Sequence, residues 1–249
     1  MKKMDSVEKY VEAIIKEFES ISGKYNTLEL FYDWIDGQMG CLNVITGYDG
    51  DGSKYLEHLN KAHKEHTNEQ NKSYNKIFTL LKEGLRKYKK DILGRVAFKL
   101  ASDYDESLGL NLTENGGALV AGLLLHDTSD IRKSINEHGY ASLQIYGIGS
   151  GSVVLSSLEI LEEEGIDLNK VYFVTSESNI RLAQMAIMQL TLLDVKAVVT
   201  EMPALIEPLK SGYISTPLAM DLYGKEVLLN NMIRVKEIQN IALMRHLSK

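Results

Sequence analysis

The order of predicted elements between residues 141 and 200 constrains the fold more than any other feature of this sequence. Short runs of β-forming residues predict strands at 141–146, 171–175 and 195–200, and the longer stretches between them predict helices at 153–164 and 179–193. Strands that alternate with helices pair in parallel, because each helix returns the chain to the edge at which the strands begin. We therefore expect an α/β protein with a wound parallel sheet.

The chain before this pattern is predicted to be helical. Apolar residues between Val7 and Ile21 and between Leu28 and Leu42 recur with the spacing of one buried helical stripe. Further helices are expected at 54–67, 73–90, 119–125 and 129–138, with a polar loop at 101–115. The sequence thus predicts a helical region over residues 1–110 and an α/β domain over residues 111–249.

The segment from Tyr146 to Ser152 reads Tyr-Gly-Ile-Gly-Ser-Gly-Ser, directly after one predicted strand and at the start of a helix. Glycines let a backbone come close to a ligand, and the N-terminus of a helix favours polar or anionic groups. Glu177 follows at the end of the next strand, where an acid can accept hydrogen bonds from both hydroxyls of a ribose. The alternative is a tight turn that binds nothing.

Three segments of this region resemble the DNA adenine methyltransferases. They are Gly149-Ser150-Gly151-Ser152, the strand Val171-Tyr-Phe-Val-Thr-Ser-Glu177, and the helix from Met185 to Val195. The similarity is to the methylases of type I restriction-modification systems and to short methylase-like proteins of bacteriophages. Other segments add to the resemblance: Asp91-Ile-Leu-Gly94, Gly109-Leu-Asn-Leu-Thr113-Glu114 and Ser215-Thr216-Pro217.

The resemblance implies a Rossmann-like sheet that binds S-adenosylmethionine. It places the glycine turn beside the methionine half of the cofactor and Glu177 on the ribose, and it retains Thr113 from a Phe-Thr-Pro signature. The implied cofactor-binding residues are Thr113, Gly149, Ser150, Gly151, Ser152 and Glu177. Because the chain has room for few strands after Val199, we expect an N-terminal helical region followed by a truncated Rossmann-like methyltransferase sheet.

The chain departs from the family at several functional positions. Where the family has an Asp-Pro-x-Cys segment before the glycine turn, this sequence has Ile145-Tyr146-Gly147-Ile148, which lacks a carboxylate for the ammonium group of the cofactor. Met202-Pro203 stands where the family places a residue near the adenine ring, and proline donates no backbone hydrogen bond. We expect Tyr146 or Met202 to narrow the ligand pocket.

The proline count bears on catalysis. Amino-methyltransferases use an (Asp/Asn)-Pro-Pro-aromatic tetrapeptide to hold the target amino group of a flipped base. The three prolines of this chain (Pro203, Pro208 and Pro217) are not adjacent, so the tetrapeptide cannot be written and no catalytic residue is assigned. The phage proteins of the family also commonly lack it.

Three functions therefore remain open. The favoured interpretation is a catalytically degenerate protein that acts by binding a partner, either DNA or a host or phage protein. The second is an active S-adenosylmethionine-dependent DNA adenine methyltransferase with an unrecognised base-binding loop near Ser215–Pro217. The third is a binding module for another nucleotide. An incomplete parallel sheet also leaves an edge to be covered, which favours a homo-oligomer.

Composition limits the environment of the protein. The formal net charge is −6, which argues against a generally nucleic-acid-coating surface. The single Cys41 cannot form an intrachain disulfide, and charged residues interrupt the N-terminal stretch that could have formed a signal peptide. We expect a cytoplasmic protein that has no membrane partner.

Other clusters have ordinary interpretations. His58, His63 and His66 are too scattered on a helical face to indicate a metal site, and the loop at 49–53 lacks key calcium ligands. The segment 82–99 carries seven Lys or Arg against two acids and is either a phosphate-contacting patch or a solvated helix face. Trp34 and Cys41 are predicted to lie in the core.

Overall fold

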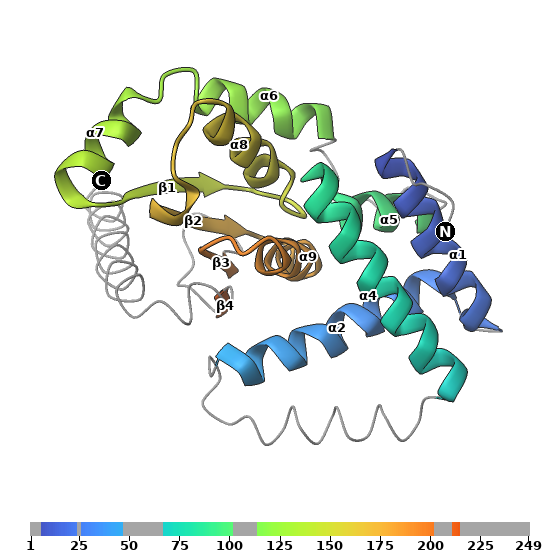
Figure 1. The fold of residues 1–249 in the computed structure, drawn as a ribbon. Coiled ribbons are helices and arrows are strands. Elements are labelled where there is room, and N and C mark those ends of the chain that lie inside the picture. The colour runs from blue at the N-terminus through green and yellow to red at the C-terminus, as the bar shows by residue number, and fades with distance from the viewer. Residues whose placement is uncertain (1–5, 24–25, 47–66, 102–113, 202–210, 215–249) are drawn as a thin grey trace, which may run out of the picture.

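The computed structural model describes residues 6–23, 26–46, 67–101, 114–201 and 211–214. In chain order, the described elements are α1 (Val7–Ser22), α2 (Thr27–Thr46), α4 (Asn68–Tyr88), α5 (Ile92–Leu100), α6 (Glu114–Leu124), α7 (Ser129–His138), β1 (Ala141–Tyr146), α8 (Ser152–Glu163), η2 (Leu168–Lys170), β2 (Val171–Glu177), α9 (Ile180–Leu192), β3 (Ala197–Glu201) and β4 (Ser211–Ile214). Helices thus precede an alternation of strands and helices (Figure 1). This order confirms the predicted α/β fold class, a helical N-terminal region followed by a truncated Rossmann-like sheet.

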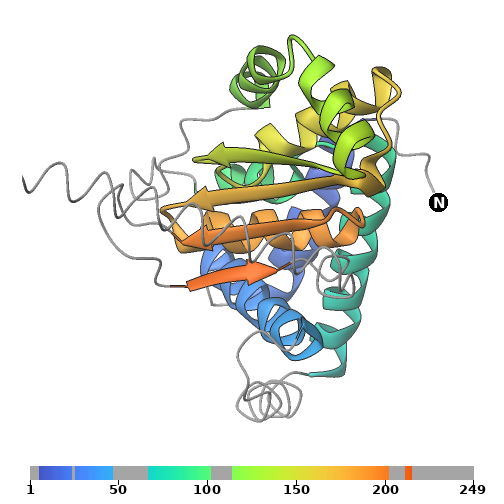
Figure 2. The ribbon, with the colours of Figure 1, turned by 90° about the vertical axis from the view of Figure 1, so that its left-hand side faces the viewer.

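The described sheet has the strand order β1-β2-β3-β4. β1 pairs with β2 and β2 with β3 in parallel, as predicted, so that Tyr146 lies opposite Ser176 and Glu177 opposite Glu201. β4 pairs antiparallel with β3 and was not predicted. The carboxyl ends of β1 and β2 therefore lie side by side at one edge of the sheet (Figure 2).

Helix α9 lies between the sheet and the N-terminal helices. It contacts β2, β3 and β4 on one side and α2, α4 and α5 on the other. Every residue from Leu182 to Leu190 is buried, as expected for a helix that is covered on all sides. Figure 2 shows α2 and α4 on the same side of the sheet as α9.

The hydrophobic core is continuous across the predicted domain boundary. One cluster of buried side chains runs from α1 residues such as Ile14 and Phe18 to Phe173 and Val199 of the sheet. Trp34 belongs to it and contacts Phe18 edge-on, with the ring centroids 5.7 Å apart, which confirms its predicted place in the core. Cys41 is only half-buried, and this burial raises the pKa of its thiol. The boundary near residue 110 stays a prediction.

The opposite face of the sheet carries a smaller cluster. Tyr172 and Val198 are buried there with Tyr140 and Val174 packed against them. The alternation of side chains along each strand separates the two faces, because Phe173 and Ala197 point towards α9 while Tyr172 and Val198 point away from it.

Helix α6 begins five residues earlier than the sequence predicted. The sequence predicts a polar loop up to residue 115 and a helix from residue 119, but the structure is helical from Glu114 through Gly116 and Gly117. A Cβ atom on Gly117 would lie 2.7 Å from the Ser152 hydroxyl of α8, so glycine is needed there for close packing of two helices. The outer side of α6 exposes Leu119, Leu123 and Leu124.

Other boundaries differ from the predictions by a few residues. β2 extends two residues beyond Thr175, so Glu177 is its last residue. Helix α4 begins at Asn68, before the predicted start at 73, because Thr67 and Gln70 form a capping box. The helix predicted at 54–67 lies, except for Thr67, outside the described residues.

Candidate functional site

The glycine turn connects β1 to α8 in the predicted place. Gly147, Gly149 and Gly151 have φ angles of 67°, 59° and 110°, in the left-handed region that side chains other than glycine rarely adopt. A Cβ atom on Gly147 or Gly149 would meet no described residue within 4 Å. Glycine is therefore required at these two positions by the backbone conformation and not by crowding from the described residues.

The turn is attached to the end of β2. The amides of Gly147 and Ile148 donate to the Ser176 carbonyl at 2.8 and 3.3 Å. The Gly149 amide donates to Glu177 Oε2 at 2.7 Å, and the other carboxylate oxygen accepts from the Asn179 amide at 3.0 Å. Glu177 is buried, and its carboxylate thus connects the glycine turn with the turn that precedes α9.

A buried polar network lies behind the turn and comprises Asp91, Ser150 and Gln189. The Ser150 hydroxyl donates to Asp91 Oδ2. Gln189 Nε2 donates to Asp91 Oδ1 at 2.9 Å and to the Ser150 carbonyl at 2.8 Å. Asp91 Oδ1 also accepts from the Gly94 amide at 2.9 Å, which caps the N-terminus of α5. The network joins the helical region to the turn.

Gln189 completes this network on its other side. Its Oε1 accepts from the amides of Ile92 and Leu93 at 2.9 and 3.1 Å, and its side chain is fully buried. The amide group of one glutamine thus satisfies the first turn of α5 and also binds the acid that caps it. Buried polar groups need such partners, because an unpaired one is costly.

The predicted cofactor residues lie together but present different groups. The backbones of Gly149 and Gly151 and the carboxylate of Glu177 lie at the carboxyl ends of β1 and β2. The Ser150 side chain faces Asp91 in the protein interior, so it can act on a ligand only through its backbone. The Ser152 side chain faces Gly117 of α6, and no described residue accepts or donates a hydrogen bond to its hydroxyl. Thr113 lies outside the described residues.

The residues that depart from the family motif occupy different environments. Ile145 is buried in the core, where a carboxylate would have needed a partner. Tyr146 is 61% exposed at the end of β1, and its expected narrowing of a ligand pocket stays a prediction. Met202, Pro203 and the segment 215–217 lie outside the described residues.

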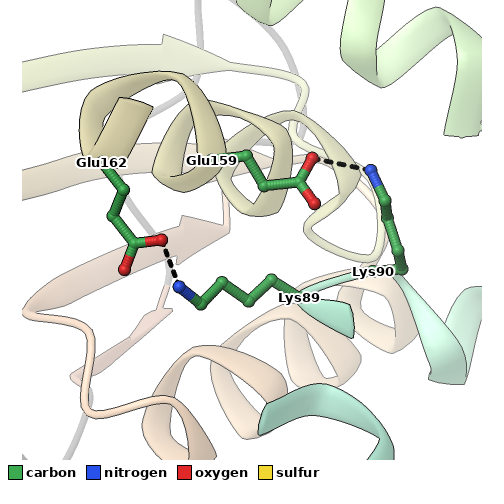
Figure 3. Close-up of polar contacts among 4 residues, drawn as sticks. All are labelled: Lys89, Lys90, Glu159 and Glu162. Atoms are coloured by element: carbon green, nitrogen blue, oxygen red, sulfur yellow. Dashed lines mark hydrogen bonds and ion pairs between the residues drawn. The ribbon is translucent and has the colours of Figure 1, made fainter. Parts of the chain in front are cut away.

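Four of the seven cations of segment 82–99 are engaged in ion pairs. Lys89 pairs with Glu162, and Lys90 pairs with Glu159 at 2.7 Å (Figure 3). Arg95 and Lys99 both pair with Glu8 of α1. These ion pairs join the helical region to α8 and α1 to α5. They therefore favour a structural role for these cations over a phosphate-contacting patch.

The described part of the chain lacks two kinds of feature. It contains no group of three or more His, Cys, Asp or Glu side chains that could hold a metal ion. None of its helices is both long enough and apolar enough to cross a membrane. The histidines at 58, 63 and 66 and the loop at 49–53 lie outside it.

Sequence reasoning did not identify the network behind the turn. The sequence places Asp91 in a segment that resembles the methyltransferase family and assigns no role to Gln189. A signal for Gln189 was present, because it stands in the otherwise apolar stretch from Met185 to Leu190 of a buried helix. A polar side chain in such a place requires a buried partner. The sequence does not show that Asp91 is this partner, because Asp91 is 98 residues away along the chain.

The fold and the site together define a Rossmann-like α/β protein with a glycine turn and an acid at two neighbouring strand ends. No protein-family model and no curated protein matches the sequence. Among solved structures, the chain is similar to a Listeria monocytogenes protein provisionally described as a class I S-adenosylmethionine-dependent methyltransferase, at 14% identity and a TM-score of 0.41. The alignment covers 80% of this chain and 55% of that protein, so the chain spans little more than half of its length.

Proposed function

We propose that this protein binds a nucleoside ligand of the S-adenosylmethionine type at the carboxyl ends of β1 and β2. The observation that carries the proposal is the contact between Glu177 and the glycine turn, with Glu177 Oε2 2.7 Å from the Gly149 amide. In Rossmann-like sheets, ligands bind outside the carboxyl ends of the strands, with a glycine turn and an acid on neighbouring strands. The same two features lie side by side here.

The residues present fit the nucleoside half of such a ligand. No described residue lies within 4 Å of a Cβ atom placed on Gly147 or Gly149, and the N-cap of α8 is Gly151, which has no side chain to bond the first amides of that helix. Glu177 Oε2 accepts only from the Gly149 amide among the described residues, so its second lone pair can accept a ribose hydroxyl, whereas Oε1 already accepts from the Asn179 amide and the Ser178 hydroxyl. The methionine half of the ligand has fewer binding groups, because Ile145 stands where the resembling family has the carboxylate that binds the ammonium group.

We propose that this protein does not catalyse methyl transfer. S-adenosylmethionine, when bound, supplies an electrophilic methyl group, but the chain has no adjacent prolines with which to build the tetrapeptide that holds a target amino group. We propose that it acts by binding a partner, either DNA or a host or phage protein, and that the ligand stabilises the binding form. Active methyl transfer to DNA adenine is the alternative.

Thermal unfolding and calorimetric titration, each with S-adenosylmethionine and with S-adenosylhomocysteine, test whether the protein binds this class of ligand. Binding should raise the melting temperature, because a ligand at about a hundredfold excess over its Kd stabilises the folded state by about 2.7 kcal/mol. Glu177→Gln should abolish the shift, whereas Glu163→Gln, at an exposed site on α8, should preserve it. The melting temperature of each ligand-free variant separates lost binding from lost stability. Absence of any shift in the wild-type protein would overturn the proposal.

A tritiated-methyl transfer assay separates the two functions. We expect no transfer to duplex DNA that contains adenine in all sequence contexts. Sequence-specific transfer would overturn the non-catalytic proposal and establish the alternative. Gel-shift titration of DNA and light scattering of the purified protein then examine the proposed DNA partner and the proposed self-association.

A further inference from the structure

The glycine turn has an open side and a supported side. On the open side, a Cβ atom on Gly147 or Gly149 would meet no described residue within 4 Å. The supported side is Ser150, whose buried side chain points towards Asp91 at the start of α5. A turn with three glycines in the left-handed region has high conformational freedom in isolation, so its shape depends on what it is attached to.

Ser150 is held through both its side chain and its backbone. Its hydroxyl donates to Asp91, and its carbonyl accepts from Gln189 Nε2 at 2.8 Å. The two partners come from α5 and α9, and the hydrogen bond between Gln189 Nε2 and Asp91 Oδ1, at 2.9 Å, fixes them relative to one another. The position of the Ser150 peptide, and with it the direction of the neighbouring amides, is thereby set from behind.

The supported side is also closely packed. A Cβ atom on Gly94 would lie closer than 3.0 Å to both the Ser150 hydroxyl and the Asp91 carboxylate. The first turn of α5 therefore rests directly against the glycine turn. Nothing of the size of a methyl group fits between them without displacing one of the two.

We propose that Asp91 and Gln189 are positioning residues, which fix the conformation of the glycine turn and through it the affinity for a nucleoside ligand. The helical region is then part of the ligand site, through the contact of Asp91 with the supported side of the turn. The ligand part of this inference rests on the proposed function, whereas the conformational part does not.

Two variants with the same chemical change test the inference in the full-length protein. Ser150→Ala removes the hydroxyl that donates to Asp91. The matched control is Ser157→Ala, which removes an equally buried hydroxyl that donates to the Val153 carbonyl within α8. Amide hydrogen exchange at residues 149–153 of the ligand-free protein reports on the turn, and calorimetric titration with S-adenosylhomocysteine reports on affinity.

We expect Ser150→Ala to accelerate exchange in the turn by about tenfold and to weaken S-adenosylhomocysteine binding by a similar factor, because one hydrogen bond to a charged group is lost. Ser157→Ala should change neither. Asp91→Asn should reproduce the Ser150→Ala result, since it keeps the size of the side chain and removes its charge. Unchanged exchange in both variants would overturn the positioning role.

Faster exchange with unchanged affinity would also overturn the inference, because the turn conformation would then not govern binding. If the wild-type protein binds no nucleoside, the proposed function fails alone. The exchange measurement is made without ligand and would still decide whether the contact between Asp91 and Ser150 fixes the turn.

Discussion

Three consecutive residues join the helical region to the α/β part of the molecule in two different ways. Lys89 and Lys90 reach Glu162 and Glu159 across a partly exposed surface, with side chains 30% and 27% exposed (Figure 3). Asp91, the next residue, is 7% exposed and lies in the buried network with Ser150 and Gln189. The sequence does not show which of these three charged side chains is buried, since all three directly follow the same helix.

The difference shows that burial determines what a charge contributes. Water and salt screen the exposed lysine pairs, so such pairs typically contribute about 0–1 kcal/mol to stability. Breaking a buried hydrogen-bonded charge leaves its partners without water or protein to bind, which costs about 3–5 kcal/mol. Adjacent charged residues in one linker can thus contribute very different free energies to stability.

Asp91→Ala should have the largest effect. It removes the cap of α5 and leaves donors on Ser150 and Gln189 unpaired, so we expect the free energy of unfolding to fall by about 2–5 kcal/mol. Urea denaturation measures the change. Asp167→Ala is the control, because Asp167 caps η2 from an exposed position and its loss should cost about 1 kcal/mol. Equal losses in the two variants would remove the distinction between buried and exposed charge.

Gly94→Ala should come next. The added methyl group would collide with Ser150 and Asp91, and overpacking of this kind costs about 1–3 kcal/mol. Gly122→Ala is the matched control in α6, where a Cβ atom would meet nothing within 4 Å and alanine should stabilise the helix by about 0.5–1 kcal/mol. Thermal unfolding of both variants gives the comparison, and a neutral Gly94→Ala would contradict the close packing of α5 against the turn.

The Lys90–Glu159 pair should show a smaller coupling. A double-mutant cycle of Lys90→Ala and Glu159→Ala is expected to give an interaction energy of about 0.2–1 kcal/mol that decreases as salt is added. The cycle cancels other contacts of each residue. A coupling above about 2 kcal/mol that is insensitive to salt would place this surface pair in the same category as the buried network.

Glu8 offers the smallest and most pH-dependent effect. The hydrogen bond from Lys99, together with Arg95, lowers the pKa of this carboxyl in the folded protein. A lowered folded pKa contributes stability above the ordinary pKa of the group, and that stability is lost as pH falls through the lowered value. Because Glu8 is 43% exposed, screening limits the contribution to a few tenths of a kcal/mol.

The measurement compares wild type with Glu8→Gln at several pH values. We expect the wild-type protein to be slightly more stable at neutral pH, and the difference to decrease as pH falls below the ordinary pKa of a glutamate and to vanish once pH is below the lowered pKa of the folded protein. Glu12→Gln, at an exposed position on the same helix, is the control and should show no such dependence. A difference that persists in acid would mean that the ion pairs are not its source.

Much of the fold was predictable because it follows from local patterns. Apolar spacing predicted α1 and α2, the longer stretches between strands predicted α8 and α9, and the β-forming runs predicted the three parallel strands. The glycine turn and Glu177 were also placed together correctly, since the carboxyl ends of adjacent parallel strands meet at one edge of a sheet. The antiparallel β4 and the early start of α6 were missed, because pairing and close helix packing override local propensity.

The sequence by itself determined which segments form helices and strands and where the glycine turn lies, because periodicity and glycine act over a few residues. Only the tertiary structure decided that Asp91, rather than Lys89 or Lys90, supports that turn. Its partners Ser150 and Gln189 are 59 and 98 residues away, and hydrogen bonds over such separations depend on how α5 and α9 pack together. Burial, which sets the energy of each charge, is a property of that packing and not of the residue type.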